Sequence, residues 1–339
     1  MRLAKAIDPK HVGHITQHTD QRGPVTVDHD QEHTWTPPAY QGRQKMLQDA
    51  INHHDMIQST PIGLGEQGIM PKGIVNHGGH RWILKNYHDA QRDVTPQHPI
   101  AGWAERTTQA LYHAGDIGHL HQEVHHVTAK DQDGHEHPMV AIRVEPGVKP
   151  FYGKKAAPEH AHAAGQVMLM DFLTDNNDRH GGNLMLQGDG SPLAIDHGLA
   201  YQYRDQNDDV GNYRAGSAVS AWDLEDGHAH QLGQWWTQNA PAIRGAFQQR
   251  LGMIKSPEVR DHLARHFEAR ASHLDGVFHA IHTNTIPQPK QPEPGSGWGK
   301  LRRPPATPVT HLLNAPMMRL DPTGAPTGGH PPAHRSAAE

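Results

Sequence analysis

The sequence has no cysteine. Disulfide bonds, catalysis by a thiolate and zinc sites built on cysteine are therefore excluded. No run of 18 apolar residues occurs either, so we expect no membrane span. The opening MRLAKAIDPKHVGH lacks the apolar region of a signal peptide. Together these absences predict a soluble protein of the cytoplasm.

Apolar residues and positive charge are also scarce. Hydrophobic residues make up 35% of the chain, and the formal net charge is −5 with histidine neutral. Proteins that bind nucleic acid usually present a basic face, and anionic membrane surfaces attract basic segments. The composition therefore predicts neither a nucleic-acid partner nor a general attraction to lipid surfaces.

Histidine is the unusually abundant residue, with 32 copies in 339 positions. Close histidine pairs can indicate metal binding, and this chain has several: His119/His121, His125/His126, His135/His137, His160/His162 and His228/His230. They are scattered over predicted strands, loops and helices, with no helical H-E-x-x-H motif. We therefore favour a structural or compositional role, and we keep a metal-buffering protein as an alternative.

The predicted elements follow the order β-hairpin, helix, β-hairpin and then mostly helices. The apolar spacing predicts a helix over 41–58, strands over 73–75 and 80–85, a helix over 101–115, and strands over 121–128 and 138–145. Asn76-His77-Gly78-Gly79 is a strong hairpin signal, and Pro146-Gly147 stand where a hinge would lie. Beyond them we expect a helix over 157–174, strands over 183–186 and 193–195, and helices near 229–250 and 257–281.

This order predicts an α+β fold of two lobes. We expect a partly ordered N-terminal extension (1–58), a small β-rich N-lobe (59–148) and a mainly helical C-lobe (149–284). The tail (285–339) is rich in proline and glycine. It cannot bury enough apolar surface to order itself, so we predict that it is disordered.

Three polar residues carry the chemistry that the sequence suggests. Asp178 and Asn183 flank two glycines in a loop that leads into the predicted hairpin, and Asp196 follows the second strand of that hairpin. Because a hairpin folds back on itself, Asn183 and Asp196 should meet at its open end. An amide oxygen and a carboxylate suit Mg²⁺ that bridges phosphates. Asp178 would lie beside this site, where it could take a proton from an attacking hydroxyl group. Each residue taken singly also fits a turn stabilised by its own side chain.

Phosphoryl transfer also needs a cation for the phosphates. Lys85 ends an apolar strand, and Glu105 lies on the next predicted helix, where it could pair with that lysine. A G-x-G-x-x-G pattern at Gly63, Gly65 and Gly68 precedes the strand hairpin. It fits either a loop that covers phosphates or an ordinary flexible link, and both readings stay open.

The segment LTDNNDRHGGNLML followed by LAIDHGLAY resembles the catalytic and metal-binding loops of phosphatidylinositol 3- and 4-kinases, nearest to the type II 4-kinases and their bacterial relatives. That family has the pattern N-x-D-R-H-x-x-N and, after a short hairpin, I-D-x-G. The matching residues are Asn176, Asp178, Arg179, His180, Asn183, Ile195, Asp196 and Gly198.

The resemblance implies a protein-kinase-like fold that uses ATP and Mg²⁺. It implies that Asp178 is the catalytic base, that Asn183 and Asp196 bind Mg²⁺, and that Lys85 contacts the ATP phosphates with Glu105 as its partner. Arg179 and His180 belong to the same catalytic motif, and we expect them to orient the loop.

Two departures from the family pattern bear on the substrate. His197 stands where D-F-G kinases have phenylalanine, and the stretch from Tyr201 to Trp222 holds only two cationic side chains, Arg204 and Arg214. Lipid kinases usually read an anionic headgroup with basic residues in that stretch. We therefore expect the phosphate acceptor to be a protein or a small molecule before a lipid. A catalytically inactive pseudokinase or scaffold is the alternative, although the complete set of Asp178, Asn183, Asp196 and Lys85 favours activity.

Overall fold

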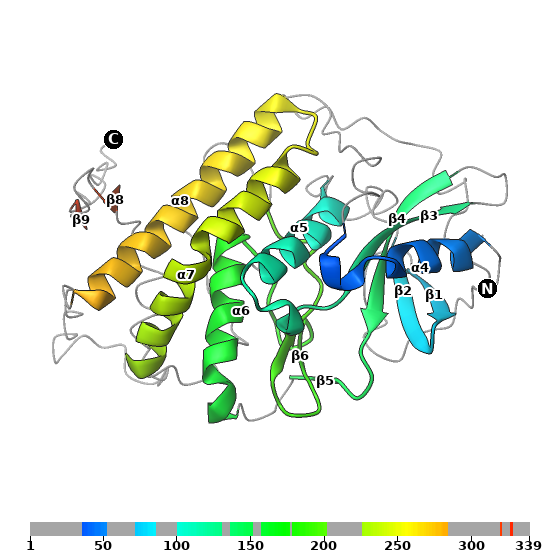
Figure 1. Ribbon diagram of the computed structural model, residues 1–339, viewed down its shortest axis with the longest axis horizontal. Helices are drawn as coiled ribbons and strands as arrows, with labels where there is room; N and C mark the ends of the chain where they lie inside the picture. Colours follow the sequence, from blue (N-terminus) through cyan, green and yellow to red (C-terminus); the bar gives the residue numbers. More distant parts are fainter. Residues whose placement is uncertain are drawn as a thin grey trace, which may run out of the picture.

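The computed structural model describes residues 36–52, 72–85, 100–130, 136–151, 157–176, 178–201 and 226–283, together with two short strands at 319–320 and 326–327. The arm at 1–35, the Gly63/Gly65/Gly68 stretch and the rest of the predicted tail lie outside the described residues. Within the described part, the predicted α+β architecture is confirmed: a small antiparallel sheet is followed by a helical carboxyl-terminal part (Figure 1).

The amino-terminal sheet has four antiparallel strands in the order β1-β2-β4-β3. They are β1 (Lys72–His77), β2 (His80–Lys85), β3 (Val124–Lys130) and β4 (Glu136–Val144). The predicted hairpin joins β1 to β2, with His77 opposite His80. Its two loop residues, Gly78 and Gly79, have φ values of 59° and 75°, which glycine adopts without strain and which the tightest hairpin turns require. Strand β2 lies inside the sheet because it pairs with both β1 and β4, and Lys85 is its last residue.

Helix α4 (Arg43–Asn52) covers one face of this sheet, after the short 3₁₀ helix η1 (Pro38–Tyr40). Its buried residues Leu47 and Ile51 share a core with Trp82 and Leu84 of β2. The predicted N-terminal extension (1–58) contains this helix, which packs on the sheet of the predicted N-lobe.

Helix α5 (Ala101–Ala114) lies between the sheet and the helical part of the molecule (Figure 1). It ends at Gly115, as predicted. The Trp103 ring lies 5.1 Å from that of Tyr201 and 6.3 Å from that of Phe247, and its indole N–H donates a 2.9 Å hydrogen bond to the carbonyl of Arg250. Much of α5 is thus buried in the core of the helical lobe.

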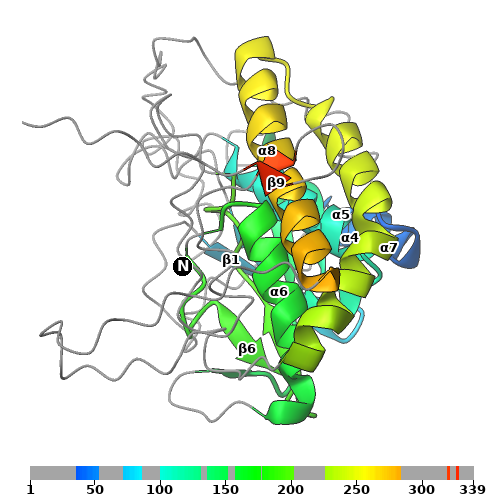
Figure 2. The same ribbon diagram turned by 90° about the vertical axis from the view of Figure 1, so that its left-hand side faces the viewer.

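Three long helices form the carboxyl-terminal part: α6 (Ala161–Leu173), α7 (Asp226–Leu251) and α8 (Pro257–His282). Figure 2 shows them packed side by side. Helix α6 is buried on several sides, as its apolar stretch predicts, with residues 167–170 all buried. The short 3₁₀ helices η3 (Gly118–Leu120) and η4 (Pro158–His160) flank this part.

A second, three-stranded sheet lies beside α6, in the order β5-β6-β7. The predicted hairpin appears as β6 (Leu184–Leu186) and β7 (Pro192–Ala194), and β5 (Lys149–Pro150) pairs with β6 directly after the predicted hinge. The tail, predicted to be disordered, has one exception among the described residues: β8 (Arg319–Leu320) pairs with β9 (Pro326–Thr327) and contacts α8. None of the helices that the structure describes is both long and apolar enough to cross a membrane.

Candidate active site

Lys85 lies at the centre of the predicted site. Its Nζ is 2.8 Å from Oδ1 of Asp196 and 3.2 Å from Oε1 of Glu105. Burial alone would lower the pKa of Lys85, but the two carboxylates outweigh it and the pKa is raised. The lysine therefore stays charged while it is almost fully enclosed, which is the state required of a cation that binds phosphates.

Glu105 connects Lys85 to the loop that carries Asp196. This carboxylate on α5 is 1% exposed. One oxygen accepts from Lys85, and the other accepts a 3.0 Å hydrogen bond from the backbone N–H of His197. The predicted pairing of Glu105 with Lys85 is therefore present, and the same carboxylate also fixes the backbone next to Asp196.

Asp178 and Asn183 contact each other across the glycine turn. The amide nitrogen of Asn183 donates to both the carboxylate and the carbonyl of Asp178, at 2.9 Å in each case. Burial raises the pKa of Asp178, and the negative charge of Asp196 raises it further, whereas His180 and Asn183 oppose the shift. The charge of Asp196 therefore acts on Asp178, and the place of Asp178 beside a metal site stays a prediction.

The β6–β7 hairpin brings Asn183 and Asp196 to one end. Leu184 pairs with Ala194, and the backbone N–H of Ile195 donates a 3.1 Å hydrogen bond to the carbonyl of Asn183. Directly after this pairing, Asp196 adopts a left-handed backbone with φ 56°, which aspartate tolerates better than most residues. The chain turns there, and the Asp196 carboxylate meets Lys85.

Arg179 is buried behind these residues and connects several of them by hydrogen bonds. Its guanidinium uses all five N–H donors: two bind Asp171, one binds the carbonyl of Asn183, one binds the carbonyl of Ile195 at 2.6 Å, and one binds the ring of His197 at 2.7 Å. The two carbonyls belong to Asn183 itself and to the neighbour of Asp196. Arg179 therefore positions both predicted metal ligands, in line with the expectation that it orients the loop.

The sequence reasoning missed Asp171, which is the counter-ion of Arg179. Its two oxygens accept hydrogen bonds of 2.9 Å from the guanidinium, and one of them also accepts from Asn176 at 3.1 Å. Burial raises the pKa of Asp171, while Arg179 and Asn176 favour the carboxylate. A signal existed: an aspartate within the apolar stretch of a buried helix needs a cationic or hydrogen-bonding partner.

His180 lies at the surface of the same loop. Its Nδ1 accepts a 2.9 Å hydrogen bond from the backbone N–H of Gly182, and its Nε2 is 3.9 Å from the Asp178 carboxylate. It stabilises the turn and lies beside the predicted base. Of the residues predicted for this site, only Gly63, Gly65 and Gly68 lie outside the described part of the chain.

His197 and His121 form a buried pair behind Asp196. Their rings stack with centroids 4.5 Å apart. Burial lowers the pKa of both rings, to about 3 for His121 and well below the usual range for His197, where the Arg179 charge adds to the effect. Both rings are therefore neutral at pH 7, and they pack against each other behind the loop that carries Asp196.

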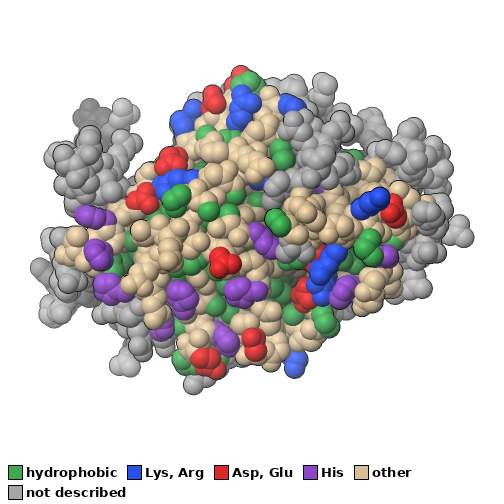
Figure 3. All heavy atoms as spheres, viewed as in Figure 1, with side chains coloured by type: hydrophobic (Ala, Val, Ile, Leu, Met, Phe, Trp, Pro, Cys, Tyr) green, Lys and Arg blue, Asp and Glu red, His purple; other side chains and the backbone are tan. Residues whose placement is uncertain are grey.

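The other histidines give no sign of a metal centre in the described ranges, where no group of three or more histidine, aspartate or glutamate side chains could hold an ion. Figure 3 shows histidines spread over one face of the molecule rather than gathered in one cluster. The Asn183–Asp196 pair offers only two ligands. Such a pair suits Mg²⁺, which takes one or two protein oxygens and completes its shell with phosphate and water. Because the Asn183 amide nitrogen binds Asp178, the amide oxygen remains as the metal-binding atom.

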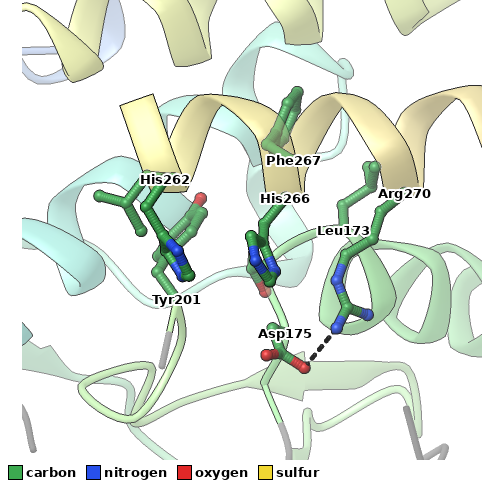
Figure 4. A pocket seen from close by; sticks show the side chains of 9 residues that line it. Leu173, Asp175, Tyr201, His262, His266, Phe267 and Arg270 are labelled. Atoms are coloured by element: carbon green, nitrogen blue, oxygen red, sulfur yellow. Dashed lines mark hydrogen bonds and ion pairs between the residues drawn. The ribbon is translucent and has the colours of Figure 1, made fainter. Parts of the chain in front are cut away.

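A small pocket lies apart from this cluster, between α8 and the two loops that flank the site (Figure 4). None of its lining residues is one of the predicted site residues. At its edge, Arg270 of α8 binds the carboxylate of Asp175 at 2.8 Å and the carbonyl of Phe172 at 3.1 Å. Asp175 has a left-handed φ of 53° and comes three residues before Asp178. Helix α8 thus supports the start of the loop that carries the predicted base.

No protein-family model matches this chain, and no curated protein sequence matches it. Among solved structures, it is similar to the Helicobacter pylori proinflammatory kinase CtkA, with 12% sequence identity and a TM-score of 0.45. That similarity covers 68% of this chain and 97% of the other. A likeness at this level says nothing about function. The resemblance to phosphatidylinositol 3- and 4-kinases therefore stays a prediction.

Proposed function

We propose that this protein is a kinase, which transfers the terminal phosphoryl group of ATP to a hydroxyl group with the help of Mg²⁺. The observation that carries the proposal is the contact of Lys85 with both Glu105 and Asp196. Phosphoryl transfer depends mainly on positioning and on charge, and a lysine oriented by a glutamate beside a metal-binding aspartate supplies both.

Each residue has a defined task in this reaction. Asn183 and Asp196 would hold Mg²⁺, which neutralises charge on the phosphates when bound. Lys85 would bind phosphate oxygens as a fixed cation, and Glu105 would keep its ammonium group in place. Asp178 would accept the proton of the acceptor hydroxyl while the new O–P bond forms and the bond from the terminal phosphorus to ADP breaks.

The direct contact between Lys85 and Asp196 affects how the site would bind Mg²⁺. A lysine in contact with a carboxylate shields it from a metal, so Asp196 must exchange this contact for the ion. The side chain of Asp196 is 44% exposed, whereas those of Lys85 and Glu105 are 8% and 1% exposed. Asp196 is therefore the partner that is open to an incoming metal, and the Lys85–Glu105 pair would persist.

The type of kinase, its location and its acceptor are proposed from the resemblance to phosphatidylinositol 3- and 4-kinases. The kinase would be of the phosphatidylinositol 3-/4-kinase-like type and would act in the cytoplasm. Its acceptor would be a protein or a small molecule, because the sequence after Tyr201 offers few cations for an anionic lipid headgroup.

The test is to incubate the full chain with ATP and Mg²⁺, to measure ADP release, and to analyse the protein by mass spectrometry for added phosphate. We expect both signals in the wild type and their loss in Lys85→Met and Asp196→Asn. Lys149→Met is the matched control, since Lys149 is exposed on β5, and it should behave as the wild type. Undiminished ADP release by Asp196→Asn would overturn the proposal.

Two further outcomes would redirect the assignment. Binding of Mg²⁺ and ATP without any ADP release would make the chain a pseudokinase. Added AMP in place of added phosphate would indicate adenylyl transfer on the same fold.

A further inference from the structure

The residue that follows Asp196 is a histidine in a fully buried position. The ring of His197 is 0% exposed. Its Nε2 lies 2.7 Å from Nη2 of Arg179, and its backbone N–H donates to Glu105. His197 therefore contacts Arg179 on one side and Glu105, the partner of Lys85, on the other.

The contact with Arg179 determines which ring nitrogen of His197 carries the hydrogen. A guanidinium has five N–H donors and no acceptor. Nε2 must therefore accept, so the ring is neutral and its single N–H is on Nδ1. That Nδ1 is 3.9 Å from Oε2 of Glu105, which is beyond hydrogen-bond distance, so the N–H meets the carboxylate only through its longer-range attraction.

The same contact distinguishes a histidine from a phenylalanine at this position. The other four donors of Arg179 bind Asp171 and the carbonyls of Asn183 and Ile195. A phenylalanine would place a slightly larger ring there and would leave the fifth N–H without the His197 acceptor in a site closed to water. Burying such a donor is unfavourable, so Arg179 or the chain around Asp196 would have to move.

We propose that His197 is a positioning residue, whose ring accepts the fifth hydrogen bond of Arg179 and thereby holds Asp196 in the turn that directs its carboxylate to the metal. This inference rests on the proposed function, because it assigns Asp196 to Mg²⁺. His197 does not touch the reacting atoms. It acts through Arg179, Glu105 and the backbone of Asp196.

Two substitutions at position 197 separate this role from simple packing. His197→Gln keeps an acceptor at about the reach of Nε2, and His197→Phe keeps the ring but removes the acceptor. We expect the Gln variant to retain most of the ATP-dependent activity. In the Phe variant we expect kcat for ADP release to fall roughly 10- to 100-fold and the Mg²⁺ concentration for half-maximal rate to rise.

The matched controls are His119→Gln and His119→Phe, since His119 is exposed on η3 and both variants should equal the wild type. A Phe variant as active as the wild type, together with an impaired Gln variant, would show that the ring only packs and would overturn the proposal. Equal losses in both variants would overturn it as well.

A measurement on the unaltered chain covers the case in which the variants do not fold. Neutron diffraction should show hydrogen on Nδ1 of His197 and none on Nε2, and hydrogen on Nε2 would refute the proposal. The kinase proposal and the role of His197 can also be refuted independently of each other. A wild-type chain that forms no ADP refutes the kinase and leaves the neutron result to decide the hydrogen bond, whereas an active chain with a fully active Phe variant refutes only the role of His197.

Discussion

The ion pair between Asp171 and Arg179 gives the sharpest test of the site's architecture. Replacing Asp171 with asparagine keeps the shape of the side chain and removes its charge. The two oxygens of Asp171 accept from three N–H groups, two of Arg179 and one of Asn176. An asparagine NH₂ group would therefore face a donor in either orientation, and the guanidinium would lose its counter-ion.

The expected loss is large because neither side chain reaches water: their exposed fractions are 1% for Asp171 and 0% for Arg179. Breaking a buried ion pair by removing one partner costs about 3–5 kcal/mol. A domain has a free energy of unfolding of about 5–15 kcal/mol, so Asp171→Asn should remove a large fraction of it. Urea unfolding followed by tryptophan fluorescence and circular dichroism measures this change.

The control is Asp261→Asn, an exposed position on α8, which should change the free energy of unfolding by less than about 0.5 kcal/mol. A loss below about 1 kcal/mol for Asp171→Asn would refute the reasoning, because a cation with an unmatched charge cannot remain buried at so small a cost. The double variant Asp171→Leu with Arg179→Met adds a second arm. Replacement of both charges by apolar groups removes the unmatched buried charge. We expect only part of the lost stability to return, because the carbonyls of Asn183 and Ile195 also lose their Arg179 donors, and activity should not return.

Three further predictions concern the base, the buried histidines and the tail. Asp178→Ala should lower kcat by about 10²–10⁴-fold and leave binding of Mg²⁺ and ATP in place, as measured by single-turnover kinetics and calorimetry; an unchanged kcat would exclude Asp178 as the base. His121, with its pKa lowered from 6.5 to about 3, takes up a proton on unfolding at acid pH, so stability should fall as pH drops below 6.5, by up to about 1.4 kcal/mol per pH unit. His121→Gln should flatten that slope in urea unfolding between pH 7 and pH 5, and an identical slope would contradict the assignment. Removal of residues 284–339 should leave activity and Tm nearly intact, because α8 packs mainly on α7 and α6 and has only a short contact with β8 of the tail; a large loss of either would show that the tail contributes to the fold.

The parts of the fold that follow local rules could be predicted from the sequence. Gly78 and Gly79 set the first hairpin because few other residues accept their positive φ. The second hairpin, with its turn at Gly188–Ser191, fixes which residues meet at its open end, so the approach of Asn183 to Asp196 followed from spacing alone. The apolar stretch of α6 likewise predicted burial on several sides, which the structure confirms.

The parts that depend on tertiary packing could not be predicted. Helix α5 carries Arg106, Thr107, Thr108 and Gln109 in succession, so polar side chains point to nearly every side of the helix, yet all four are buried. They are enclosed because α5 lies between the sheet, α4 and α7, and Arg106 donates a 3.3 Å hydrogen bond to Gln44 of α4. The strand order β1-β2-β4-β3 and the pairing of Arg179 with Asp171 have the same origin, since both depend on which distant segments come together.

The position of α5 determines how the Lys85 contacts depend on the arrangement of the two lobes. Glu105 is on a helix anchored in the helical lobe, where Trp103 packs on Phe247 and binds the Arg250 carbonyl. Asp196 is held from the same side, by Arg179 through the carbonyl of Ile195. Both partners of Lys85 therefore belong to one body, while Lys85 itself belongs to the sheet. A shift of the sheet away from α5 would break both ion pairs together, whereas a shift within the helical lobe would leave Glu105 and Asp196 in register. The two contacts of Lys85 therefore depend on how the sheet is placed against the helical lobe, and under the proposed function a nucleotide bound between them would act on both contacts.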